Sequence, residues 1–442
     1  MSMAGGWWLV RNAECCRRPG VLAAGLTAAL PAPAANLLAA VTSPQAAATS
    51  PPGNTGHFLL ATVYILLIFA GISVGVIVMN WVERKVLAHM QVRLGPMRVG
   101  PHGLLQPIAD ALKLLLKEDL VPQGADHLVF WLAPVVVVVA AFSAFTAIPF
   151  GPTAAVSDLN IGVLFVLAVA SLGVLGIIFA GWSSNSHYPL LGALRAGAQM
   201  VSYEITIGLA VVAVLLHTGT LSMQGIVRAQ IDHQQWLLFR EPVAFGLFAV
   251  AMVAETNRSP FDLPEAESEL VAGYHAEYSG FRWSLFMLGE YAGMMLVSAV
   301  AVTLWLGGWT RPFPNVHAAG LDALFSFVPA ACFLLLAGMA LRAAWKMPGH
   351  RRWRVQRDGL AVFGSLLLGL GLLLAVPPMR TACQNVFWFV LKVAVFQYLF
   401  IWYRATFPRY RYDQLLRIGW RILIPTALAN LVLSATLTAL RP

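Results

Sequence analysis

The chain has 442 residues, of which 59% are hydrophobic and 11% are charged, and its formal net charge is +9. Such a composition lies far outside the range of soluble globular domains and predicts an all-α polytopic membrane protein. The positive charge does not indicate nucleic-acid binding, because the basic residues are spread over several loops between apolar runs instead of forming one patch.

The cysteines exclude another class of site. The four of them, Cys15, Cys16, Cys332 and Cys383, show no CxxC spacing and no accompanying pair of histidines. The sequence therefore predicts neither an iron–sulfur cluster nor a zinc site in this chain. Any redox metal is expected in a partner protein.

Residues 1–56 differ in character from the rest and are rich in Ala, Pro, Ser and Thr. Arg17 and Arg18 precede an apolar stretch that ends before SPQAAA, a pattern that resembles a signal peptide with a small-residue cleavage site. A start site assigned too early, or a dispensable tail, explains the same segment equally well. No fold is expected for it.

About ten apolar runs follow, each long enough to cross a bilayer as a helix, which takes roughly 17–25 residues. The runs near 199–216 and 359–377 have the weakest signal. The ten lie near 58–82, 127–149, 160–182, 199–216, 237–254, 284–306, 321–343, 359–377, 386–403 and 418–439.

The loops between these runs alternate in basic charge. By the positive-inside rule, the loops rich in Lys and Arg lie on the cytoplasmic (or matrix) side, and the N-terminus of the apolar core lies outside. We expect a multi-pass protein of the cell inner (plasma) membrane. Twenty of the 29 Lys and Arg residues fall in the loops 83–126, 183–199, 255–283, 342–358 and 404–421.

The first basic loop combines turns with a helix. Glycines and prolines between residues 95 and 103 impose the turns. The following IADALKLLLKED repeats apolar residues at helical spacing, as in a helix that lies at the membrane interface. Asp110 lies inside this apolar segment, after a Gln-Pro turn. The preceding Glu83-Arg84-Lys85 is typical of a charged anchor that snorkels at the end of a span.

Glu204 lies a little more than one helical turn inside the fourth apolar run. Burial of a lone carboxylate favours its protonated form, which suits a group that takes up and releases protons. Pairing with Arg195, or hydrogen bonds to neighbouring helices, would give Glu204 a structural role instead.

Residues 255–290 contain seven of the 20 carboxylates of the chain. Negative charge held against a membrane is costly unless it is used, paired or protonated. Two prolines break the chain after Glu255, and in the helix-compatible stretch that follows Glu265 and Glu269 share a face while Glu267 points elsewhere. Like charges at that spacing repel, so at least one is expected to be protonated or to meet a cation. A solvated acidic loop fits less well, because Pro, Phe, Tyr and Leu interleave the acids.

Lys392 is the single cation in the apolar run 386–403. At membrane depth it needs a carboxylate, a carbonyl or a chain of waters, so it is either functional or a member of a structural ion pair. The loop after it, WYRATFPRYRYDQLLRIGW, alternates arginines with aromatic residues. Taken alone, that alternation is typical of an interfacial belt.

Together these segments resemble one family, the membrane subunit of respiratory complex I that adjoins the quinone site. It is called the H subunit in bacteria and subunit 1 in mitochondria. The matching segments lie in order across about 70% of the chain and are ERKVLAHMQVRLGPMRVGPHGLLQPIADALKLLLKED, RAGAQMVSYE, AETNRSPFDLPEAESELVAGYHAEYSG, GEY, LGGW and RATFPRYRYDQLLRIGW.

The resemblance implies a membrane subunit of a proton-translocating NADH:quinone oxidoreductase, with no redox centre of its own. FMN and iron–sulfur clusters would be held by peripheral-arm partner subunits, and the substrate quinone, ubiquinone or menaquinone, would enter from the lipid through this chain. Small membrane subunits would connect it to antiporter-like subunits.

The resemblance also implies roles for individual residues. Quinone-chamber candidates are Arg84, Asp110, Arg258, Asp262, Glu265, Glu267 and Glu269. Candidates for the proton-coupling path are Glu204, Glu255, Glu277 and Glu290, to which the position of Lys392 adds a basic candidate. Arg404, Arg409, Arg411 and Asp413 would lie at the quinone entrance or support it.

One segment departs from the eight-helix pattern of the family. Residues 313–385 are predicted to be an inserted transmembrane hairpin between a core at 57–312 and two last core helices at 386–442. Because two added spans preserve the topology downstream, the RYDQ segment stays on the cytoplasmic side. The hairpin could face lipid or contact a partner.

Two other functions fit part of this pattern. The homologous subunit of a hydrogenase, a formate hydrogenlyase or a quinone oxidoreductase with another donor would share many of the motifs, although the long acidic motif with the RYDQ segment favours quinone-reducing enzymes. A self-contained ion transporter would carry intramembrane acids too. Transporters often contain inverted repeats, and no internal repeat is visible here.

Overall fold

The computed structural model describes residues 55–152, 154–263, 272–312, 319–347 and 351–440. Within these ranges the chain forms helices and loops and no strand, which confirms the predicted all-α polytopic fold. Residues 59–442 form one unit by their internal contacts, and the helices discussed below belong to it.

Nine helices in the described ranges are long and apolar enough to cross a bilayer. They are α4 (Thr55–Met90), α6 (His127–Ala144), α7 (Gly162–Ser183), α8 (His187–Thr218), α13 (Gly280–Trp305), α14 (Ala319–Lys346), α15 (Arg351–Ala375), α16 (Pro377–Thr406), and α17 (Tyr412–Ile418), which continues through a π-helical turn at Gly419–Leu423 into α18 (Ile424–Ala439).

The remaining predicted span is a short helix. The apolar run 237–254 forms α10 (Leu237–Arg240) and α11 (Pro242–Glu255), and α11 has only 14 residues. At about 1.5 Å per residue it is roughly 21 Å long, shorter than the roughly 30 Å hydrocarbon layer. Pro242 at the first turn of α11 lacks an N–H, which suits a helix start. The run 199–216 is the second half of α8, which begins at His187.

The central and peripheral helices differ in burial. In the most apolar stretch of α13, 61% of the residues are buried inside the protein, and in that of α8 50% are, against 17% for α4 and for α14. α8 and α13 therefore form the inside of the bundle, whereas α4 and α14 present most of their side chains outward. α6, α7 and α11 pack against these two central helices.

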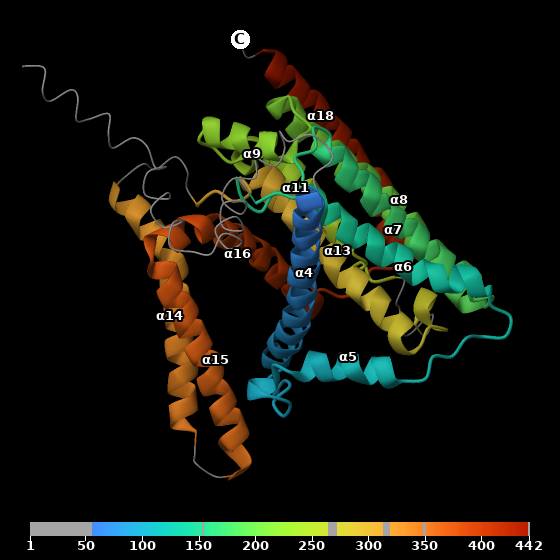
Figure 1. The fold of residues 1–442 in the computed structure, drawn as a ribbon. Coiled ribbons are helices and arrows are strands. Elements are labelled where there is room, and N and C mark those ends of the chain that lie inside the picture. Colours follow the sequence, from blue (N-terminus) through green and yellow to red (C-terminus); the bar gives the residue numbers. More distant parts are fainter. Residues whose placement is uncertain (1–54, 153, 264–271, 313–318, 348–350, 441–442) are drawn as a thin grey trace, which may run out of the picture. The chain divides into compact units, whose positions relative to one another are not determined.

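Short helices connect the long ones. α5 (Gln106–Leu116) runs across the end of α4 (Figure 1) and follows a 3₁₀ turn at Pro101–Gly103. Its side chains Ile108, Leu112 and Leu115 remain exposed, as expected for a helix at a membrane interface. The other short helices are α9 (Met223–Asp232) and the 3₁₀ turns Phe145–Ala147 and Gly273–His275.

The segment predicted as a hairpin contains α14 and α15, which run side by side (Figure 1). Gly364 and Gly371 of α15 face Leu341 and Leu334 of α14, and the absent side chains allow the two helices to approach closely. The next helix begins at Pro377, so α16 already covers the last residues of the predicted insertion.

Candidate functional site

Arg258 is the centre of a buried charge cluster at the end of α11. Its guanidinium lies 3.3 Å from Oε1 of Glu83 and 2.6 Å from Oε1 of Glu290, and it stacks 4.6 Å from the ring centroid of Tyr291. Side-chain exposure is 9% for Arg258, 6% for Glu83 and 10% for Glu290. One arginine therefore joins carboxylates from α4 and α13 where water does not screen them.

Glu83 ties three helices together. Its carboxylate accepts a hydrogen bond of 2.8 Å from the Tyr291 hydroxyl of α13, and it pairs with Arg404 of α16 as well as with Arg258. Each of its oxygens has a donor, which is the condition under which a buried charge is tolerated. Loss of one partner of such a pair usually costs about 3–5 kcal/mol, because the other charge stays buried.

From the sequence pattern, Glu83 was interpreted as part of a charged anchor, and for this residue the interpretation was wrong. The buried side of α4 includes Ile72, Val76, Met79 and then Glu83. These positions repeat at helical spacing, so Glu83 continues the apolar stripe toward the core instead of facing the interface. The spacing was visible in the sequence and could have identified Glu83.

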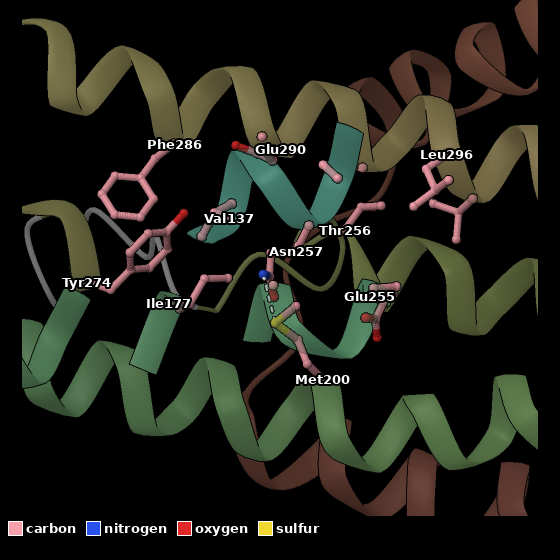
Figure 2. A pocket seen from close by; sticks show the side chains of 17 residues that line it. Val137, Ile177, Met200, Glu255, Thr256, Asn257, Tyr274, Phe286, Glu290 and Leu296 are labelled. Carbon is pink, nitrogen blue, oxygen red and sulfur yellow. Dashed lines mark hydrogen bonds between the residues drawn. The ribbon is translucent and has the colours of Figure 1, made fainter. Parts of the chain in front are cut away.

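A cavity of about 110 Å³ lies beside this cluster, between α6, α7, α8, α11 and α13. Figure 2 shows Glu290 and Glu255 on different sides of it, with Asn257 between them. Most of the remaining wall is apolar. Glu290 thus belongs to both features, since it pairs with Arg258 and also lines the cavity.

Glu204 extends the row of acids along α8. It accepts a hydrogen bond from the hydroxyl of Ser171 in α7. Glu83 and Glu290 thus share Arg258, Glu290 and Glu255 line the same cavity, and Glu204 lies on the neighbouring helix α8. A chain of acids in the interior of a membrane protein is the usual mark of a functional path.

Gln199 of α8 fixes the turn that carries Arg258. Its amide nitrogen donates to the carbonyl oxygens of Ala254 at 2.8 Å and Phe261 at 2.9 Å, and to Oδ1 of Asn257 at 3.2 Å. The Gln199 side chain therefore donates to backbone carbonyls of the turn, which a continued helix would have paired with its own N–H groups. Sequence reasoning did not select Gln199, although it lies inside the RAGAQ motif.

The acidic segment contacts the loop after α16. Asp262 is buried and pairs with Arg409 at 2.9 Å, and the backbone N–H of Tyr410 donates to the carbonyl oxygen of Pro260 at 3.1 Å. A predicted chamber residue and a predicted entrance residue thus meet. The last three acids of the predicted chamber, Glu265, Glu267 and Glu269, lie outside the described residues.

The other predicted chamber residues form a separate pair on the first loop. Arg84 contacts Asp110 at 2.6 Å, and Gln106 donates to the same carboxylate at 3.1 Å. Both charges are partly exposed, at 45% and 29%. In the same loop, burial and then the positive charge of Lys85 lower the pKa of His102, so its ring is neutral at pH 7.

Four predicted residues lie apart from the cluster. Lys392 donates to the carbonyl oxygens of Leu306 at 2.7 Å, Gly308 at 3.0 Å and Thr310 at 2.7 Å, just beyond the C-terminus of α13. Its ammonium therefore meets carbonyls and the negative end of a helix dipole. The other three are Glu277, which is half-buried, and Arg411 and Asp413, which are exposed at the start of α17.

The described residues contain no group of three or more His, Cys, Asp or Glu side chains arranged to hold a metal ion. What they do contain is a bundle of membrane-spanning helices with several acids inside it, an arginine between two of them and a small cavity beside that pair. Fold and site together define a polytopic integral membrane protein that holds ionisable side chains inside its helix bundle.

Comparison with known proteins identifies the family. The model of the NADH dehydrogenase family matches residues 63–435. The chain is 58% identical over 397 residues to the NADH-quinone oxidoreductase H subunit 1 of Koribacter versatilis (strain Ellin345), covering 87% of this chain and 93% of that protein. It is 50% identical over 384 residues to the NADH-quinone oxidoreductase H subunit 2 of Solibacter usitatus (strain Ellin6076), covering 86% and 95%.

The chain therefore belongs to the H-subunit family of NADH-quinone oxidoreductase, and it is a multi-pass membrane subunit of complex I. The resemblance stated from the motifs is confirmed. The acids and arginines of the cluster lie in the segments that carried it.

Proposed function

We propose that this subunit forms one wall of the quinone chamber and begins the path that couples quinone reduction to proton translocation. The observation that carries the proposal is the double position of Glu290, which pairs with Arg258 on one side and lines the cavity with Glu255 on the other. One carboxylate thereby connects a charge cluster near the loops to acids in the core.

The chamber side would consist of the charges at the ends of α4, α11 and α16. Arg258 and the Asp262–Arg409 pair supply positive and negative groups there, and the Arg84–Asp110 pair of the first loop adds a second edge. A mostly apolar quinone needs few polar partners to orient its head group. Glu265, Glu267 and Glu269 remain proposed members of the same wall.

The coupling rests on charge balance. Reduction of a quinone to a quinol takes up two electrons and two protons, so electrons that arrive first leave negative charge in the chamber. That charge attracts protons toward the nearest acids. Protonation of Glu290 would remove its charge from Arg258, which would keep its pairing with Glu83, and this changes the electrostatics of the cavity that Glu255 lines.

The electrons would come from partner subunits. We place FMN and the iron–sulfur clusters in peripheral-arm subunits, and small membrane subunits between this chain and antiporter-like subunits. The membrane is taken to be the plasma membrane, with the acidic and RYDQ loops on the cytoplasmic side. Lys and Arg enrichment in those loops supports that orientation.

The test replaces single acids by their neutral isosteres in the assembled complex. Glu290→Gln and Glu255→Gln are expected to lower NADH:quinone activity and coupled proton pumping by about tenfold or more, equivalent to at least about 1.4 kcal/mol, while the complex still assembles. Asp232→Asn, at an exposed position of α9, serves as the control. Unchanged turnover and pumping in both acid variants would refute the path.

A further inference from the structure

The first helical turns of α15 pack against the first loop. The side-chain amide of Gln356 donates to the carbonyl oxygen of Met97 at 2.7 Å. One turn further on, a Cβ atom added to Gly359 would lie 3.2 Å from both Cδ and Cγ of Pro101. The backbone of α15 therefore touches the loop directly, and only glycine fits at residue 359 without displacing Pro101.

The same loop is also held by α4. The ammonium of Lys85 lies 2.9 Å from the sulfur of Met97, and the indole N–H of Trp81 donates to the carbonyl oxygen of His102 at 3.3 Å. Residues 95–103, here called the first-loop turn, are thus fixed between α4 and α15.

The first-loop turn folds back on itself. Gly100 and Gly103 have φ angles of +71° and +77°, a region that favours glycine. A side chain at residue 103 would collide with the Pro96 carbonyl, so the two ends of the turn touch. α5, whose Asp110 pairs with Arg84, follows this turn directly.

The hairpin that contacts this turn has its own support. Phe325 and Phe333 of α14 make edge-on ring contacts with Trp388 and Phe387 of α16, at centroid distances of 5.8 Å and 6.2 Å. Close packing of α14 on α15 joins those contacts to the end that touches the first-loop turn. The end of α15 that touches the first-loop turn is therefore connected to α16 through the packed hairpin.

We propose that the α14–α15 hairpin is a positioning element for the first-loop wall of the quinone chamber. Gln356 and Gly359 hold the first-loop turn against α4, and this sets the place of α5 and of Asp110 along the route that quinone takes. The inference rests on the proposed function, since it assumes that the first loop lines that route.

The experiment compares glycine substitutions on one helix. Gly359→Leu should displace Pro101, whereas Gly369→Leu adds the same side chain to the same helix where no atom lies within 4 Å. Both changes raise helix propensity, so propensity cancels in the comparison. Gln356→Ala removes the hydrogen bond to Met97 and introduces no bulk, which keeps the test informative if Gly359→Leu prevents assembly.

KM and kcat for quinone in the purified complex provide the readout. Gly359→Leu and Gln356→Ala are expected to raise KM about three- to tenfold with kcat changed less than about twofold, and Gly369→Leu should leave both unchanged. A merely structural defect would lower the yield of complex or kcat without moving KM.

Asp110→Asn distinguishes a failure of this inference from a failure of the proposed function. If it raises KM while both α15 variants behave like Gly369→Leu, the hairpin does not position the loop and the inference fails by itself. If neither Asp110→Asn nor the α15 variants change KM, the first loop does not line the quinone route and the proposed function fails with it.

Discussion

Replacement of Glu83 by alanine should destabilise the subunit more than any change to an exposed acid. The carboxylate pairs with Arg258 and Arg404 and accepts a hydrogen bond from the Tyr291 hydroxyl, and the Glu83 side chain is 6% exposed. Arg404 is 40% exposed, so its share is under about 1 kcal/mol. The main loss comes from Arg258, which loses one of its carboxylates, and from a buried hydroxyl that loses its acceptor. The expected loss is about 3–5 kcal/mol.

The glutamine variant refines this magnitude. The amide oxygen of Glu83→Gln still accepts one hydrogen bond, so only part of the charge interaction is lost and the expected cost falls to about 1–3 kcal/mol. Stability should therefore increase in the order Glu83→Ala, Glu83→Gln, wild type. Glu118→Ala, at an exposed position near the end of the first loop, should stay within about 0.5 kcal/mol of wild type.

The assay is detergent-induced unfolding of the purified complex. Native electrophoresis measures how much intact complex remains, and the thermal midpoint of the membrane part is measured as a second readout. Equal stability of Glu83→Ala and Glu118→Ala would contradict the argument, because it would mean that the cluster is not desolvated. Equal losses for the alanine and glutamine variants would instead assign the effect to packing and not to charge.

Two further variants test structural contacts. Lys392→Met should lower the free energy of unfolding by about 3 kcal/mol or more, because three carbonyl oxygens beyond α13 lose their donor. A stable variant complex that assembles but does not pump protons would contradict this and would instead assign Lys392 to the proton path. Gly192→Ala should reduce the yield of folded complex, because a Cβ atom at residue 192 would lie 2.8 Å from the backbone nitrogen of Tyr274. Gly208→Ala on the same helix is the control: no atom lies within 4 Å of the added Cβ, so this variant should fold normally.

Hydropathy and charge predicted much of the fold, because span length and the positive-inside rule are properties of sequence composition. They failed at α11, where the apolar run continues through residues 237–254 but Glu241 and Pro242 divide it. An apolar count does not detect such a division. The backbone hydrogen bonds that end one helix and begin the next decide it.

The candidate site was only partly accessible from the sequence. Arg258 and Glu290 were both selected, yet their contact joins residues 32 positions apart on different elements, and no local pattern encodes that pairing. Glu83 was missed because its neighbours Arg84 and Lys85 gave the segment the character of an anchor. Lys392 was correctly expected to need polar partners, and the structure supplies carbonyls.

The shortness of α11 has a consequence for how polar chain is admitted to a bilayer. The turn after α11 is held by Gln199, twelve residues into α8 and so roughly 18 Å from the start of that helix. Hydrocarbon offers an exposed N–H or C=O no partner, so irregular chain within a bilayer persists only where other protein groups solvate it. Here one amide side chain replaces the missing water. The protein thereby keeps Arg258 in its interior, on a turn that is solvated by protein groups instead of facing lipid tails.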